Sequence, residues 1–265
     1  MPAVQSVDDA CVIEMTHRSK LRAITQLGLV LLVAFSLKSF YSTASVNDLR
    51  WILAPTTFLV ELITGKQFRF ESQAGYMSSD HTFLIAASCS GVNFLIISFL
   101  VLALGRIRRE WPGSSQWRAL PISMLSAYAA TIIANTTRIV VALYSRNIQT
   151  SWIDHDDLHR VQGIVIYFGF LLALFVASER FAARDRSVWS SGSLTGRRSA
   201  YLLAIYYAVT LGIPLMRGGY RDPAFWQHAP IVVLIPIALI ITSTVAAKVK
   251  NLKVRNVLRR KSAAT

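Results

Sequence analysis

Three polar residues that could together perform acyl transfer lie in mostly apolar parts of the chain. Cys89 lies in "AASCSGVNF", Arg138 in "IIANTTRIVV" and His159 in "WIDHDDLHRVQGIV". A cysteine thiolate is a strong nucleophile, and a nearby imidazolium or guanidinium favours it. A histidine can accept the thiol proton and later protonate a leaving amine, and an arginine can stabilise an oxyanion. These residue types predict cleavage of a peptide bond through a thioester.

Small and amide-bearing residues accompany two of these candidates. The apolar run after Cys89 predicts a helix on which Asn93 lies one turn further along the same face. Asn135 precedes Arg138 by three residues and therefore shares a face of another helix. Small residues beside a nucleophile leave room for the backbone of a substrate. The candidates for contacting substrate or an oxyanion are Ser90, Gly91, Asn93 and Asn135.

The stretch around His159 predicts the start of a further helix. Asp156 and Asp157 form an acidic first turn, which is a typical start signal, and Gly163 follows His159 on the same face. His155 is a second candidate for the base. The spacing of these His and Asp residues matches no strong ligand motif, so we expect no bound metal, and the sequence calls for no cofactor.

Composition predicts a polytopic α-helical membrane protein that must position these residues. Hydrophobic residues make up 53% of the 265 residues and charged residues 16%, and the mean hydropathy is +0.44. The apolar runs are continuous, whereas a transmembrane β-barrel would alternate apolar and polar residues. The formal net charge is +14, but there is no basic groove with interleaved aromatics. We therefore expect contacts with anionic membrane lipids and none with nucleic acid.

Six of seven apolar blocks are long enough to span a membrane, since about 20 residues are required. The exception is 51–64, which is short and carries Pro55 and Glu61. The first block is long for a cleaved signal peptide, so we expect a retained signal anchor. The blocks are 23–40, 51–64, 82–105, 119–144, 162–178, 199–216 and 229–247.

Charge bias predicts the orientation of these helices. Lys and Arg gather in the N-terminal segment 1–22, after the blocks 82–105 and 162–178, and in the tail 248–265. Such segments stay in the cytoplasm, which places both termini there. Block 51–64 then cannot span, and we expect it to be re-entrant or interfacial.

The expected fold class is an all-α transmembrane bundle. It has about six spanning helices plus one re-entrant or interfacial segment, in a single integral membrane domain over 1–265. The stretch 66–81 contains some alternation of apolar and polar residues, which predicts a short hairpin on the outer face.

Each candidate residue also has a purely structural interpretation. Cys89 could be a packed core residue, because free cysteine is among the most buried residue types. Arg138 could snorkel to lipid headgroups, and the acidic residues before His159 could form a solvated loop. The orientation places all three candidates near the outer membrane surface, and ionisable groups at that depth favour a functional interpretation.

The three motifs resemble those of the exosortase/archaeosortase family. The family pattern is Cys-Ser-Gly, then Asn-x-x-Arg, then His-x-x-x-Gly in a polytopic membrane protein. This chain has "SCSGVNF", "NTTR" and "HRVQG" in that order within 88–163. Its short length is similar to that of the exosortase K branch. Many members have more helices than we expect here, which leaves the exact topology open.

The resemblance implies a cysteine transpeptidase or protease of the bacterial cytoplasmic (inner) membrane, with its active site on the outer, periplasmic side. Its substrates would be secreted, membrane-anchored proteins that carry a C-terminal sorting signal with a transmembrane helix. By position, Cys89 corresponds to the family's nucleophile, Arg138 to its arginine and His159 to its histidine.

Two other classes of protein remain open. A transporter or lipid-handling protein would use Arg138 for an anionic substrate and Cys89 for packing. The inverted repeats or paired broken helices typical of transporters are not evident in the sequence. A membrane scaffold without catalysis would leave the three polar residues unexplained.

Overall fold

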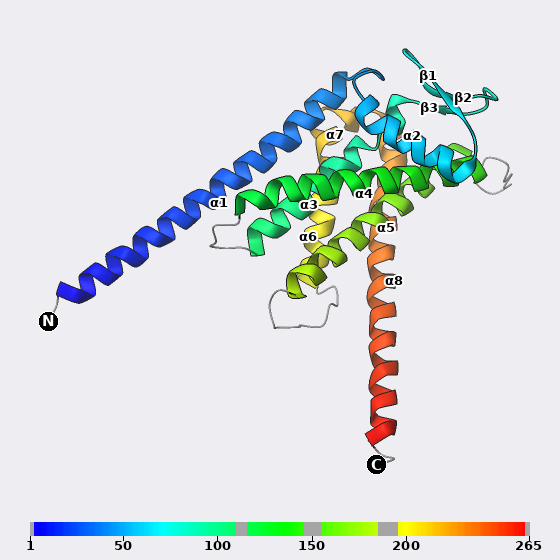
Figure 1. Cartoon of the computed structure of the whole chain (residues 1–265). Helices are drawn as coiled ribbons and strands as arrows, with labels where there is room; N and C mark the ends of the chain where they lie inside the picture. Colours follow the sequence, from blue (N-terminus) through cyan, green and yellow to red (C-terminus); the bar gives the residue numbers. More distant parts are fainter. Residues whose placement is uncertain (1–2, 110–115, 146–154, 185–195, 263–265) are drawn as a thin grey trace. The chain divides into compact units, whose positions relative to one another are not determined.

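The computed structural model describes residues 3–109, 116–145, 155–184 and 196–262, and helices dominate these ranges (Figure 1). The α-helices, in chain order, are α1 (Ala3–Thr43), α2 (Arg50–Thr64), α3 (Val92–Arg109), α4 (Gln116–Ser145), α5 (His155–Arg184), α6 (Gly196–Tyr207), α7 (Ile213–Met216) and α8 (Pro223–Ser262). A π-helical turn (Ala208–Gly212), α7 and a 3₁₀ turn (Gly219–Arg221) connect α6 to α8.

Six helical segments of the described residues are long and apolar enough to cross a membrane. This number confirms the six spans expected from the apolar blocks, and with them the class of multi-pass membrane protein. Each segment has 19 to 26 residues, close to the length that a bilayer requires. The segments are Leu21–Thr43, Ala87–Ile107, Leu120–Ser145, Leu158–Phe181, Arg198–Met216 and Phe225–Ala247.

The helix α2 is not among these segments. It has 15 residues, or about 22 Å at about 1.5 Å per residue, which is shorter than the roughly 30 Å hydrocarbon core. The Tyr128 hydroxyl of α4 donates to the Trp51 carbonyl at 2.7 Å, and their rings stack with centroids 5.7 Å apart. Phe58 and Leu62 of α2 remain exposed.

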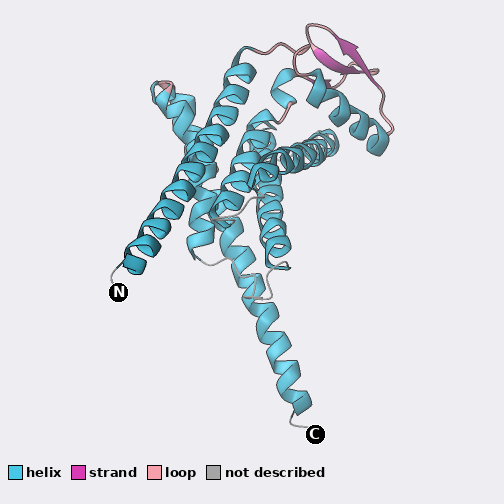
Figure 2. Cartoon of the chain, turned by 60° about the vertical axis from the view of Figure 1, so that its left-hand side comes forward, coloured by secondary structure: helices cyan, strands magenta, loops and turns pink. Residues whose placement is uncertain are grey.

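The hairpin predicted for 66–81 is present, and a third strand extends it (Figure 2). The strands β1 (Phe68–Glu71), β2 (Gly75–Ser78) and β3 (Leu84–Ile85) form an antiparallel sheet in that order. Gly75 is required because its φ is +132° and a Cβ would collide with a carbonyl oxygen of β3. Helices still dominate the described residues, which agrees with the predicted helical transmembrane bundle, and this small sheet is added to it.

Packing divides the chain into two units, Met1–Phe58 with Gln67–Ile133 and Leu59–Lys66 with Ala134–Thr265. In the first unit α1 packs along α3. The span that contains α3 is 67% buried, compared with 17% for the span of α1, so α3 forms much of the core. Its fully buried large side chains are Leu95, Ile96, Phe99 and Leu102.

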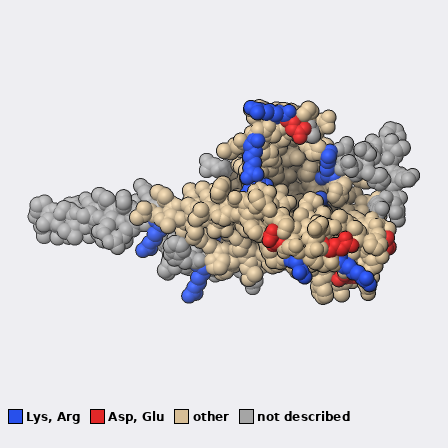
Figure 3. Space-filling view, turned by 90° about the horizontal axis from the view of Figure 1, so that it is seen from above, with Lys and Arg blue, Asp and Glu red and all other residues tan. Residues whose placement is uncertain are grey.

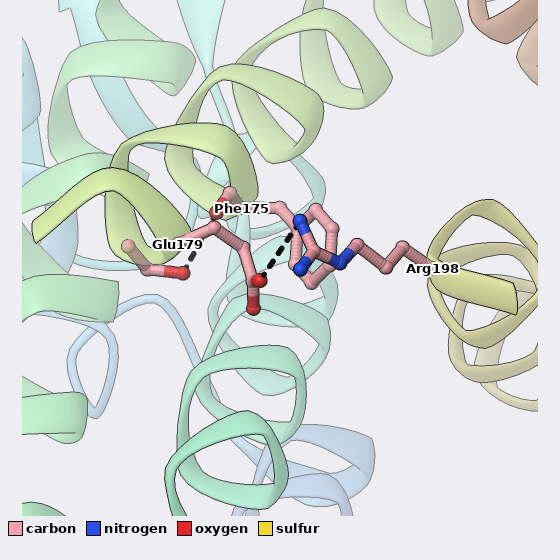
Figure 4. A network of polar contacts seen from close by, with 4 residues as sticks. Phe175, Glu179 and Arg198 are labelled. Carbon is pink, nitrogen blue, oxygen red and sulfur yellow. Dashed lines mark hydrogen bonds and ion pairs between the residues drawn. The ribbon is translucent and has the colours of Figure 1, made fainter. Parts of the chain in front are cut away.

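In the second unit α5 packs along α8, and α6 contacts α8. The Tyr207 hydroxyl of α6 donates to the Val233 carbonyl of α8 at 2.8 Å. Near the start of α6, Arg198 lies 3.5 Å from the Glu179 carboxylate of α5 (Figure 4). These contacts connect α5, α6 and α8.

Uncharged side chains cover most of the face drawn in Figure 3. Large apolar side chains are exposed along the spans, among them Phe35 of α1 at 70% and Leu125 of α4 at 69%. Extensive apolar exposure marks interaction or membrane surfaces. Lipid is the environment that suits these helices.

Candidate functional site

Arg138 and His159 meet between α4 and α5. An Nη of Arg138 lies 3.0 Å from Nε2 of His159. Arg138 stands roughly 10 Å from the end of α4, at about 1.5 Å per residue, and His159 stands in the second turn of α5. Nearer the end of α4, the Ser145 hydroxyl donates to Oε1 of Gln162 at 3.3 Å. The helix start predicted at the acidic residues is confirmed, because α5 begins at His155.

This contact determines which nitrogen of His159 carries the proton. A guanidinium has donors and no acceptor, so Nε2 must accept the hydrogen bond and the ring proton resides on Nδ1. His159 is then a neutral imidazole whose lone pair is held by Arg138. Such a ring can act as a general base when the arginine turns to another acceptor.

Tyr167 connects Arg138 to Asn135. The other Nη of Arg138 donates to the Tyr167 hydroxyl at 3.4 Å, and that hydroxyl donates to Oδ1 of Asn135 at 2.8 Å. The guanidinium also lies 5.5 Å from the centroid of the Tyr167 ring, within the range of a cation–π contact. Asn135, which is fully buried, therefore belongs to the same cluster, as its spacing predicts.

Tyr167 is not among the residues expected from the sequence. The sequence nevertheless contains a spacing that could have indicated Tyr167, because this residue follows His159 by eight residues and Gly163 by four. This spacing places the three residues on one face of α5.

Gly163 makes room for the guanidinium. A Cβ at this position would lie 3.2 Å from Nε of Arg138, whereas a Cβ at Gly169, further along α5, would meet nothing within 4 Å. The glycine of the "HRVQG" motif therefore leaves the space that the side chain of Arg138 occupies. A larger residue would displace the side chain of Arg138.

Two buried polar atoms of α4 have no hydrogen-bond partner within the part of the chain that the structure describes. They are Nε of Arg138 and Oγ1 of Thr136. Buried polar groups are normally paired, and leaving one unpaired costs about 1–3 kcal/mol. Within the cluster, Nε of Arg138 therefore remains a donor that no described residue uses.

Cys89 lies ahead of α3 and not within an α-helix. Ala87–Cys89 form a 3₁₀ turn, and Gly91 follows with a φ of +72°. The helix expected over 82–105 is therefore wrong at its start, because β3 and this left-handed glycine precede α3. The one-turn relation expected between Cys89 and Asn93 is wrong for the same reason.

The turn leaves Cys89 half-buried and buries Ser90 completely. The Ser90 hydroxyl has no hydrogen-bond partner among the described residues. The Gly91 carbonyl accepts from the Leu95 N–H at 3.0 Å and so begins the hydrogen-bond ladder of α3. Cys89 is therefore close in sequence to a helix N-terminus, which favours negative charge.

Lys38 of α1 reaches the first turn of α3. Its Nζ donates to Oδ1 of Asn93 at 2.7 Å and lies 5.7 Å from the centroid of the Tyr41 ring. Lys38 is half-buried and Asn93 is exposed. Lys38 is also not among the residues expected from the sequence. The available signal is its position inside the apolar block 23–40, where an ionisable residue is costly.

The expected site residues form one group in each unit. Asn135, Arg138 and His159 form the cluster of the second unit, to which the structure adds Tyr167 and Gly163. The first unit holds the other group at the start of α3, to which the structure adds Lys38; its expected members are Cys89, Ser90, Gly91 and Asn93.

Within the described ranges, no three His, Cys, Asp or Glu residues gather closely enough to hold a metal ion. The side chains of His155, Asp156 and Asp157 lie outside the described residues.

No protein-family model, curated protein or solved structure matches the chain. The fold and composition define a multi-pass helical membrane protein.

Proposed function

We propose that this chain is a membrane-embedded cysteine transpeptidase or protease of the exosortase type. The observation that carries the proposal is the hydrogen bond of 3.0 Å between Arg138 and His159. These residues come from two separate motifs of the resemblance, and α4 and α5 bring them together. The half-buried thiol of Cys89, in a turn just before a helix N-terminus, supports the role of nucleophile.

The reaction begins when the Cys89 thiol proton passes to Nε2 of His159. The sulfur bonds to the carbonyl carbon of the substrate peptide, and the π electrons move to the oxygen, where Arg138 or amide donors stabilise the charge. Collapse of this intermediate breaks the C–N bond, and the imidazolium returns its proton to the leaving amine. An acceptor amine or water then attacks the thioester carbon, the C–S bond breaks, and the proton lost by the acceptor restores the Cys89 thiol.

This sequence of steps requires Arg138 to exchange partners. In the resting state the guanidinium occupies the lone pair of His159 that must receive the thiol proton. An oxyanion or a substrate carboxylate is a stronger acceptor for the guanidinium than a neutral imidazole. The unpartnered Nε and the long 3.4 Å contact with Tyr167 support this exchange.

The proposal includes the arrangement in the membrane. Both termini lie in the cytoplasm, α2 is interfacial or re-entrant, and the reaction occurs at the outer side of a bacterial cytoplasmic membrane. Substrates are secreted proteins held there by a C-terminal transmembrane sorting signal. The charge bias of the connections and the short, partly exposed α2 support this arrangement.

Mass spectrometry of a trapped thioester tests the proposal. The protein is co-expressed with secreted proteins that carry candidate sorting signals, and the peptide containing Cys89 is examined for an acyl adduct. We expect an adduct in the wild type and none in Cys89→Ala. Cys89→Ser, Arg138→Ala and His159→Ala should abolish processing at unchanged membrane insertion. Normal processing by Cys89→Ala would overturn the proposal.

The reaction also requires the thiol to reach His159. In a Cys11→Ser background, His159→Cys should form a disulfide with Cys89 on mild oxidation. Gly169→Cys, further along α5 in open space, is the matched control and should not. A disulfide with the control alone would contradict the assigned roles.

A further inference from the structure

Lys38 makes a specific contact that a lysine inside a spanning helix does not need. A lysine near a helix end can satisfy its charge by snorkelling to lipid headgroups and water. Lys38 instead places Nζ 2.7 Å from Oδ1 of Asn93, which belongs to another helix. This contact ties α1 to the first turn of α3, four residues after Cys89.

The contact fixes the direction of the Asn93 amide. The two ends of an amide are often hard to assign, but an ammonium has three donors and no acceptor. The amide oxygen must therefore face Lys38, because the reverse orientation would oppose two donors. The Nδ2 group, with its two N–H donors, faces away from Lys38.

Asn93 holds this amide at the end of the helix that favours an anion. It is the second residue of α3 and is exposed, although its neighbours Val92 and Phe94 are only 1% and 3% exposed. The first intrahelical bond runs from Leu95 to Gly91, so the N–H groups of Val92 and Asn93 precede the ladder. The Nδ2 donors thus add to the positive end of the helix dipole.

We infer that Lys38 is a positioning residue that presents the Nδ2 donors of Asn93 to the oxyanion formed during acyl transfer at Cys89. The inference rests on the proposed function and deepens it by assigning one oxyanion donor and the residue that orients it. Without Lys38 the amide could rotate and present its oxygen, which would repel the oxyanion.

Two reactions of the Cys89 thiol distinguish a loss of oxyanion stabilisation from a change in the accessibility or ionisation of the thiol. p-Nitrophenyl acetate acylates a thiolate through an oxyanion: the C–S bond forms, the carbonyl π electrons move to oxygen, and collapse expels p-nitrophenolate. Iodoacetamide alkylates the thiolate by direct displacement of iodide, with no oxyanion. The chain has only two cysteines, so Cys11→Ser leaves Cys89 as the single thiol for both probes.

The informative variants alter Asn93 in two ways in this background. Asn93→Asp keeps an acceptor for Lys38 and removes both N–H donors, whereas Asn93→Leu removes every polar group. We expect both to lower the ratio of acylation to alkylation on the order of 100-fold, as loss of an oxyanion donor does elsewhere. Lys38→Met should lower the ratio in the same direction, and Lys38→Arg should largely restore it.

Several results would overturn the inference. The ratio could remain at the wild-type value in Asn93→Asp and Asn93→Leu, or it could fall in Asn93→Asp alone, which would indicate charge repulsion. If the effects of Lys38→Met and Asn93→Leu on the ratio of acylation to alkylation were fully additive in the double variant, the two residues would act independently. Failure of the proposed function gives a different result, namely substrate processing that persists in Cys89→Ala.

Discussion

At the scale of single residues, Tyr167 determines how firmly Arg138 is held. Tyr167→Phe removes the hydroxyl that accepts from Arg138 and donates to the buried Asn135. We expect a loss of about 1 kcal/mol in the free energy of unfolding. We also expect a lower kcat for processing with little change in KM, because the guanidinium loses its alignment. Thermal unfolding in detergent and processing kinetics measure the two effects, and unchanged kcat would show that this alignment is not used.

Gly163 and Gly169 provide a matched pair on α5. Alanine at a helix interior normally stabilises by about 0.5–1 kcal/mol relative to glycine, so Gly169→Ala should raise the melting temperature with no effect on activity. Gly163→Ala should lose activity, because its Cβ would lie 3.2 Å from Nε of Arg138. Comparing melting temperature and processing rate in the two variants checks this expectation. Equal activity would contradict the role given to Gly163.

The sequence identifies residues whose chemistry is unusual for their surroundings. Arg138, Asn135 and His159 are polar residues in mostly apolar stretches, and helical spacing correctly groups Asn135 with Arg138. Tyr167 and Lys38 are harder to predict. Tyrosine is common in membrane helices, and a lysine near a helix end has the membrane surface as an ordinary partner. Only packing between helices shows that each has a specific acceptor.

At the scale of secondary-structure elements, hydropathy predicts the spans but not where they begin. The apolar block 82–105 is uniform enough to be taken for one helix. Its first residues instead pair with β2 as a strand, because the hairpin before them offers hydrogen-bonding partners. Gly91 then adopts a left-handed conformation, which a sequence pattern does not reveal. These two features move Cys89 from a helix into a turn.

The turn between α1 and α2 contains a carboxylate whose titration is predictable. Asp48 accepts hydrogen bonds from the Ser45 hydroxyl at 2.7 Å and the Ser45 N–H at 2.8 Å. These bonds, the hydroxyl first, hold the pKa of Asp48 below its ordinary value of 3.8. The folded state therefore favours the carboxylate. Its contribution to stability is present above pH 3.8 and is lost as the pH falls through the lowered pKa.

A ¹³C NMR titration of the Asp48 carboxyl carbon measures this shift. The midpoint should lie below 3.8, and Ser45→Ala should move it upward while the backbone bond retains part of the effect. A wild-type midpoint at or above 3.8 would contradict the structural interpretation of this turn.

At the scale of the whole molecule, the number of spans could be predicted because hydropathy acts along each helix separately. The division into two packing units depends on contacts between distant segments, which a single sequence does not display. Orientation is different again, because it is set by charge outside the helices. With six spans the two termini share one side of the membrane, provided that α2 does not cross.

The side on which Gln73 lies, compared with the side of the N-terminal segment, decides whether α2 crosses the membrane. Gln73 is exposed in the turn between β1 and β2, after α1 and α2. In a background of Cys11→Ser and Cys89→Ala, Gln73→Cys should react with a membrane-impermeant maleimide applied to intact cells. In Cys89→Ala alone, Cys11 of the N-terminal segment should react only after permeabilisation, because the charge bias predicts that this segment lies in the cytoplasm. If α2 crossed the membrane, Gln73→Cys would lie on the cytoplasmic side with the N-terminal segment and would be protected in intact cells. That result would require an odd number of crossings, place the termini on opposite sides and contradict the charge rule in the tail.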